Sequence, residues 1–238
     1  MKLVALLATL ALLAGCDAGE EDEPLTVYAA SSLTEVFERL APDARFNFAG
    51  SDELATQLRE GAPADVYAAA SPRYPRELFA ERVVDEPVVF ATNRLVLVVP
   101  SENPARIRGL EDVAASDVRL VIGGEGVPIG DYTRALLERA ERLDVLERVV
   151  SEEEDVKGVL AKVALGEADA GFVYATDARA VGGDVVAIEL PSEFQGLIEY
   201  PVAVVRDTEH GDAARGFVEL LRSARGRAAL RAAGFGVP

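Results

Sequence analysis

The chain has 238 residues and a formal net charge of −17, with one cysteine and one histidine. An acidic chain of this kind is not expected to bind nucleic acid, because that binding relies on clustered Lys and Arg. A single cysteine and a single histidine exclude an internal disulfide and a clustered Cys/His metal site, so we expect no direct cation site.

The first residues are typical of an export signal. A positive start is followed by the uncharged apolar run Leu3–Ala14, which is shorter than the roughly 20 residues that a membrane-spanning helix needs. The tetrapeptide Leu13–Cys16 resembles the lipobox of bacterial lipoproteins, which implies cleavage before Cys16 and acylation of its thiol. We therefore expect a signal peptide over residues 1–15, a lipidated acidic tether over 16–24 and an extracytoplasmic location on the cell envelope membrane.

From Leu25 onward the pattern alternates between strands and helices. The expected strands are Leu25–Ala30, Arg45–Phe48, Asp65–Ala70, Arg94–Val99, Arg119–Ile122, Gly171–Tyr174, Val185–Ile188 and Val202–Val205. The expected helices are Leu33–Leu40, Glu53–Glu60, Tyr132–Arg142, Val156–Leu165, Ala213–Arg222 and Gly226–Ala233. This alternation predicts an α/β fold with mainly parallel sheets. Because no Gly/Ser-rich linker is present, two lobes would have to be joined by ordered segments, for which the apolar runs near Val99 and Val202 are the candidates.

Four helix starts follow directly on small or polar residues. They are Ala29–Glu35, Phe48–Leu54, Gly123–Tyr132 and Ser151–Val156. In the first, Ser32 and Glu35 match the S-x-x-E capping box. Helix N-termini leave backbone N–H groups unpaired and carry partial positive charge, so they bind anions without Lys or Arg. Each junction alone is more often only a helix cap, and the glycine-rich third one fits no nucleotide-binding motif.

Several blocks of the sequence resemble the periplasmic molybdate-binding component of ABC transporters. They are Thr26–Phe37, Phe48–Ser71, Val127–Leu137, Glu154–Ala178 and Glu199–Val205. The resemblance implies a two-lobed periplasmic-binding-protein fold of type II, with the ligand in the cleft between the lobes. Each lobe is then a mainly parallel sheet flanked by helices. The lobes are expected over residues 25–100 with 201–238, and over 101–200.

The resemblance also implies a set of neutral hydrogen-bond donors for the ligand. The hydroxyl groups are those of Ser32, Ser51 and Tyr174, with Ser31 as an alternative to its neighbour. The backbone N–H groups are those of Ile129, where the family usually carries alanine, and Val156. Hydroxyl and backbone N–H groups both donate, and aligned N–H dipoles hold a dianion locally on an acidic protein.

The expected ligand is therefore molybdate, with tungstate as a second ligand of the same shape. Both are fully deprotonated near neutral pH and offer only acceptors, as does sulfate. Phosphate keeps a proton and favours a site with a carboxylate acceptor. Asp155 and Glu154 lie beside the fourth helix start, so a site for another oxyanion such as sulfate or phosphate stays open as the alternative.

An enzyme is the more distant alternative. A Ser-His-Asp hydrolase would have to use His210, which lies in a polar stretch, and no G-x-S-x-G elbow is present. A hydrolase that uses paired carboxylates is left open by the many acidic residues. The resemblance implies instead a monomeric binding protein without a cofactor, whose partners are the small oxyanion and an ABC transporter permease in the membrane.

Overall fold

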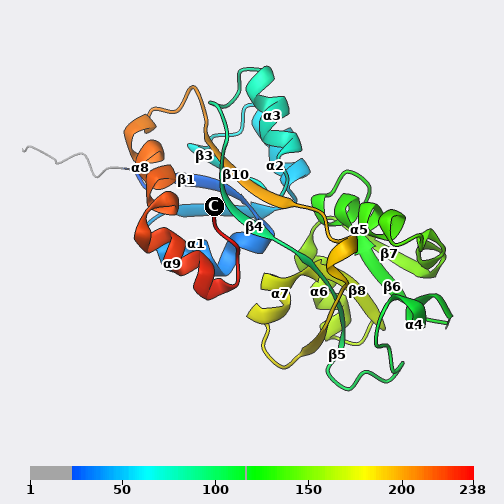
Figure 1. Ribbon diagram of the computed structural model, residues 1–238. Helices are drawn as coiled ribbons and strands as arrows, with labels where there is room; N and C mark the ends of the chain where they lie inside the picture. Colours follow the sequence, from blue (N-terminus) through cyan, green and yellow to red (C-terminus); the bar gives the residue numbers. More distant parts are fainter. Residues whose placement is uncertain (1–22, 116) are drawn as a thin grey trace, which may run out of the picture.

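The computed structural model describes residues 23–115 and 117–238. The expected signal peptide, the lipid-attachment residue Cys16 and the tether up to residue 22 lie outside the described residues. The remaining chain forms two lobes, each built on one five-stranded sheet with helices on its faces (Figure 1). Across the described ranges, no helix combines the length and the apolar character that crossing a membrane would require.

The first lobe holds both ends of the described chain. Its strands, in spatial order, are β2 (Arg45–Ala49), β1 (Thr26–Ala30), β3 (Val66–Ala68), β10 (Ile198–Val204) and β4 (Val88–Asn93). Its helices are η1 (Ser31–Leu33), α1 (Thr34–Leu40), α2 (Ser51–Arg59), α3 (Arg73–Ala80), α8 (Gly211–Arg222) and α9 (Ala224–Ala233). Figure 1 shows α8 and α9 on one side of this sheet, with α2 and α3 toward the other.

The second lobe is formed by the middle of the chain. Its strands, in spatial order, are β7 (Val149–Glu153), β6 (Leu120–Gly123), β8 (Ala170–Tyr174), β5 (Leu95–Pro100) and β9 (Val185–Glu189). Its helices are α4 (Leu110–Ala115), α5 (Pro128–Arg139), η2 (Leu143–Arg148), α6 (Val156–Ala164), α7 (Ala175–Ala180) and η3 (Ser192–Phe194).

The two sheets share one strand arrangement. In the first, β10 runs antiparallel to both of its neighbours, while β1 pairs in parallel with β2 and β3. In the second, β5 runs antiparallel to both of its neighbours, while β6 pairs in parallel with β7 and β8. Four strands of each sheet thus point the same way, and the reversed strand is the one adjoining a crossing between lobes. The expected two-lobed α/β fold with mainly parallel sheets is confirmed.

Two segments connect the lobes. The chain passes from β4 to β5 through Arg94, and returns from β9 to β10 through residues 190–197. The lobe boundaries expected at residues 100 and 201 stay a prediction. Because β5 pairs within the second sheet and β10 within the first, we place the two crossings at Arg94 and at residues 190–197.

The core explains why the apolar runs become strands. Residues Leu95–Val99 of β5 are each at most 1% exposed, as expected of a strand that is covered on both faces. Aromatic rings fill the interior of the first lobe, where Phe37 packs edge-on against Phe217 with ring centroids 5.3 Å apart. The rigid sheets hold the helix starts that follow them in fixed positions.

Candidate binding site

A small cavity lies between the two lobes where the ends of several strands meet. Its empty volume, including its mouth, is about 210 Å³. The five residues that the resemblance implied as donors all line it, namely Ser32, Ser51, Ile129, Val156 and Tyr174. Ser31, the alternative to its neighbour, lines it too. The structure therefore brings together residues that are up to 142 positions apart in the chain (32 to 174).

Three helices direct their first turns at this cavity. Ser51 is the first residue of α2, Ile129 the second of α5, and Val156 the first of α6. The N–H groups of a first turn have no acceptor within their own helix and carry the positive end of its dipole. Pro128 at the start of α5 leaves that turn without one of these N–H groups and favours the helical backbone. The cavity is thus surrounded by backbone donors from both lobes.

The Ser51 hydroxyl is oriented by the backbone of the neighbouring strand. Ala70 N–H donates to Ser51 Oγ over 3.0 Å, and Tyr67 Oη donates to the Ser51 carbonyl over 2.6 Å. Ser51 is 1% exposed. Because the hydroxyl oxygen already accepts from an N–H group, its single proton is available to an acceptor in the cavity.

Ser32 has a different partner from the one expected. The sequence pattern predicted a capping box with Glu35, and this is wrong, because η1 precedes α1 and no side chain caps either helix. Ser32 Oγ lies 2.9 Å from Tyr200 Oη in β10. Glu35 instead binds Lys157 of the second lobe.

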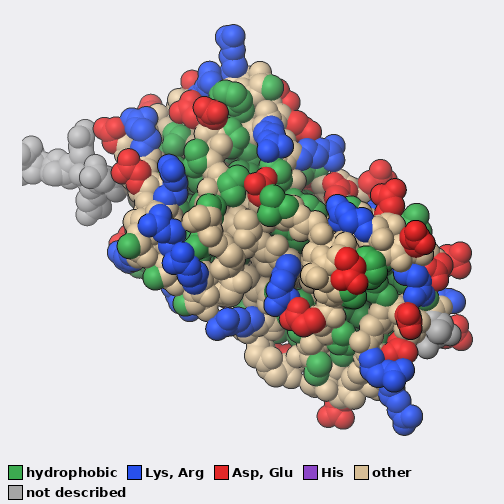
Figure 2. Space-filling model, in the orientation of Figure 1, with side chains coloured by type: hydrophobic (Ala, Val, Ile, Leu, Met, Phe, Trp, Pro, Cys, Tyr) green, Lys and Arg blue, Asp and Glu red, His purple; other side chains and the backbone are tan. Residues whose placement is uncertain are grey.

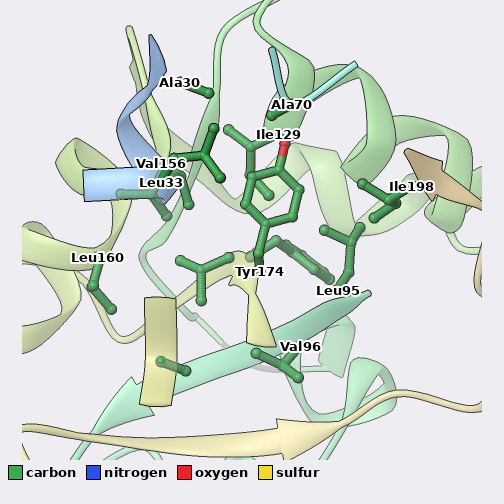
Figure 3. Close-up of a cluster of buried hydrophobic side chains, with 14 of the residues drawn as sticks. Ala30, Leu33, Ala70, Leu95, Val96, Ile129, Val156, Leu160, Tyr174 and Ile198 are labelled. Carbon is green, nitrogen blue, oxygen red and sulfur yellow. The ribbon is translucent and has the colours of Figure 1, made fainter. Parts of the chain in front are cut away.

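Tyr174 places an unpaired hydroxyl in the cavity. Its side chain, at the end of β8, is 1% exposed, and its oxygen has no hydrogen-bond partner. Figure 3 shows the ring directed toward Ile129 and Ala70, with the hydroxyl at its tip. Burial raises the pKa of Tyr174 well above its ordinary value, so the hydroxyl keeps its proton and remains a donor. An unsatisfied buried polar group costs about 1–3 kcal/mol, a cost that an acceptor bound in the cavity would remove.

Ile129 is accommodated by a glycine at the end of β6. A Cβ atom at Gly123 would lie 2.5 Å from Ile129 Cγ2, so the isoleucine side chain occupies space that only a glycine leaves free. The Ile129 side chain is 1% exposed. Its N–H remains in the first turn of α5, where a change of side chain does not alter the donor.

The charges near the cavity are negative, yet its lining holds no Lys, Arg or His among the residues that the structure describes. Burial raises the pKa of Asp52, and the neighbouring charges of Asp131 and Asp155 raise it further. The Asp155 carboxylate caps α6, because its Oδ1 accepts from Gly158 N–H over 2.9 Å. On the surface in Figure 2, acidic and basic side chains are interspersed over both lobes. The local attraction for an anion comes from N–H and O–H dipoles.

Contacts between the lobes close over the cavity. Lys157 Nζ of α6 lies 2.6 Å from Glu35 Oε1 of α1 and 3.2 Å from the buried Asp177 Oδ1. On α3, Arg73 pairs with Asp131 of α5 over 3.5 Å, and Tyr74 Oη donates to the Gly126 carbonyl. These contacts place the structure in a closed arrangement of the lobes.

The enzyme alternative gains no support from the surroundings of His210. Its Nδ1 lies 3.1 Å from Asp65 Oδ1, which also accepts from the Thr208 hydroxyl. None of these three residues lines the cavity, and in the described ranges no serine hydroxyl bonds to His210. Within residues 23–115 and 117–238, no group of three or more His, Cys, Asp or Glu side chains is placed to hold a metal ion.

Sequence reasoning missed Tyr200 and Asn93. Tyr200 is completely buried, and Asn93 Nδ2 donates to its hydroxyl over 3.4 Å and to Thr176 Oγ1 over 2.9 Å. The only available signal was the position of the tyrosine in the block Glu199–Val205 that carries the resemblance.

Comparisons with known proteins give a consistent result. The family described as bacterial extracellular solute-binding protein matches residues 25–236. The molybdate-binding protein ModA of Mycobacterium tuberculosis is 37% identical over 225 residues, which cover 90% of this chain and 85% of that protein. ModA of Haemophilus influenzae is 30% identical, with 99% of each chain covered. The structure of the Azotobacter vinelandii periplasmic molybdate-binding protein superposes with a TM-score of 0.81 at 21% identity, covering 90% of this chain and 99% of that one.

Proposed function

The chain belongs to the family of bacterial extracellular solute-binding proteins, and we propose that it captures molybdate outside the cytoplasm and delivers it to an ABC transporter permease. Relatives at 30–37% identity over most of the chain are named as molybdate-binding proteins. The observation that carries the proposal for this chain is the buried, unpaired Tyr174 hydroxyl in a cavity between the lobes.

The binding site in this proposal consists of neutral donors. Hydroxyl protons come from Ser32, Ser51 and Tyr174, and backbone N–H groups come from Ile129 and Val156. Molybdate and tungstate carry four acceptor oxygens and no proton, so each donor meets an acceptor. Hydrogen bonds to a charged acceptor are shorter and stronger than neutral ones, and the dry surroundings strengthen them further. A dianion is thus held without a cation from the protein.

The protein acts as a carrier in this proposal and catalyses no reaction. The closed lobes present their joined surface to the permease, and opening releases the anion. Acyl chains on Cys16 hold the protein at the membrane, and the tether gives it reach. The protein works as a monomer, since the cavity is completed by the two lobes of one chain.

A site for sulfate or phosphate is the second candidate, because Asp155 lines the same cavity. A carboxylate that accepts from a protonated oxyanion would favour phosphate. The Asp155 carboxylate already accepts from Gly158 N–H, which favours its role as a helix cap. The cavity therefore suits an unprotonated anion better.

Isothermal titration calorimetry of the purified protein with molybdate, tungstate, sulfate and phosphate tests the proposal. We expect tight binding of molybdate and tungstate and much weaker binding of sulfate and phosphate. Heat from phosphate alone, or from none of the four anions, would refute it.

A further inference from the structure

A row of buried polar side chains leads from the crossing between the lobes to Ser32. Asn93 ends β4, and its Oδ1 accepts from the Arg94 N–H over 2.9 Å. A backbone N–H only donates, so this contact fixes which end of the amide is oxygen. The Nδ2 end therefore faces inward, and its two hydrogens reach Thr176 Oγ1 and Tyr200 Oη, 2.9 and 3.4 Å away.

Tyr200 is the middle member of this row. Its hydroxyl oxygen accepts from Asn93 Nδ2, and its only proton is left for its other neighbour, Ser32 Oγ, 2.9 Å away. Burial raises the pKa of Tyr200 well above its ordinary value, so the proton stays on the hydroxyl. The ring is fixed by edge-to-face contacts with Phe235 and Tyr174, whose centroids lie 5.3 and 5.8 Å away.

Ser32 ends the row at the cavity. Since its oxygen receives the Tyr200 proton, its own proton is free for the cavity that the residue lines. We infer that Asn93 and Tyr200 are positioning residues that fix Ser32 as a hydrogen-bond donor and so make the site reject oxyanions that carry a proton. The inference rests on the proposed function and adds the device by which the ligand is selected.

Ser51 supports the same interpretation from the other side of the cavity. There a backbone N–H, that of Ala70, donates directly to the serine oxygen. Both serines are thus oriented by rows that begin at a backbone N–H, which cannot reverse its direction. Both hydroxyls offer protons to the ligand. A hydrogen phosphate dianion meets only donors and leaves its own proton unpaired, whereas molybdate pairs with all of them.

The variant Tyr200→Phe removes the donor that orients Ser32 and keeps the ring. We measure the affinities for molybdate and for inorganic phosphate by calorimetry at about pH 8, where both are dianions. The ratio of the molybdate affinity to the phosphate affinity is expected to fall at least about tenfold, because Ser32 can then turn and accept. Tyr28→Phe, a buried tyrosine of β1 in the same sheet, is the matched control and should leave the ratio unchanged.

The variant Asn93→Asp reverses the row and serves as the second test. A carboxylate at this position accepts the Tyr200 proton, so Ser32 donates to Tyr200 and turns a lone pair toward the cavity. The added charge acts equally on two dianions and cancels in the ratio, which should again fall. A ratio that stays within twofold of wild type in folded variants that bind molybdate would overturn the positioning role alone. Absence of molybdate binding by the wild type would refute the proposed function itself.

Discussion

Tyr174 is the residue that most clearly separates binding from folding. Its hydroxyl is fully buried without a partner, whereas the equally buried Tyr67 hydroxyl donates to the Ser51 carbonyl. A group that is unpaired in the free protein contributes nothing to folding through its hydrogen bond, and it becomes useful only when an acceptor enters the cavity.

The variant Tyr174→Phe is expected to lose affinity for molybdate without losing stability. A hydrogen bond to a charged group is worth roughly 1.5–3 kcal/mol, which corresponds to a 10- to 150-fold weaker affinity, while removal of the unpaired hydroxyl leaves the free energy of unfolding unchanged or raised. Calorimetry and urea unfolding of the free protein check both effects. Tyr67→Phe is the stability control and should lose about 1 kcal/mol. Unchanged affinity in Tyr174→Phe would remove this residue from the site.

Residue types and motifs located the candidate donors, but not the residues that orient them. Ser32, Ser51 and Tyr174 were found because their sequence blocks resemble a family. Tyr200 is 168 positions from Ser32, and nothing local marks a tyrosine in a buried strand as a hydrogen-bond partner. Such a contact depends on which strands become neighbours, which the sequence alone did not specify.

At the scale of the elements, the helix starts were predicted too late where they approach the cavity. The periodic apolar pattern placed the second helix at Glu53 and the third at Tyr132, whereas α2 begins at Ser51 and α5 at Pro128. First-turn residues that face the cavity are small or polar, so they carry no apolar period. The same polar character hid strand β7, whose sequence Val149–Glu153 ends in two acidic residues.

Helix α7 was also missed, and it holds a buried carboxylate. Asp177, in its first turn, is 1% exposed. Burial raises the pKa of Asp177 to about 7, although Lys157 opposes the shift. Six residues with mixed polarity are too short for a helical pattern to be recognised, so neither the helix nor its buried acid could be predicted from the sequence.

The raised pKa predicts a pH dependence of stability. Between about pH 4 and about pH 7 the folded protein binds a proton at Asp177 that the unfolded chain has released, so this residue lowers stability as pH rises through that window. The variant Asp177→Asn removes the effect. Relative to wild type, its free energy of unfolding should be higher at pH 8 than at pH 5 by roughly 2–3 kcal/mol, at 1.36 kcal/mol per unit. An equal difference at both pH values in urea unfolding would contradict the assignment.

At the scale of the whole molecule, the structure reconciles an acidic protein with an anionic ligand. The net charge of −17 belongs mainly to side chains outside the cavity, while the cavity itself is lined by helix starts and hydroxyl groups from both lobes. Ion pairs such as Glu35–Lys157 and Arg73–Asp131 join the lobes on either side of it. The alternation of strands and helices predicted this fold class, whereas the closed arrangement depends on contacts between distant segments.

A crystal structure of the protein grown with molybdate tests the central claim most directly. The anomalous signal of molybdenum locates the anion without reference to the shape of the cavity. We predict one peak between the lobes, with its oxygens about 2.7–3.2 Å from donors of the set that comprises Ser32 Oγ, Ser51 Oγ, Tyr174 Oη and the N–H groups of Ile129 and Val156. A peak elsewhere, or an anion held by Lys or Arg side chains, would contradict the account.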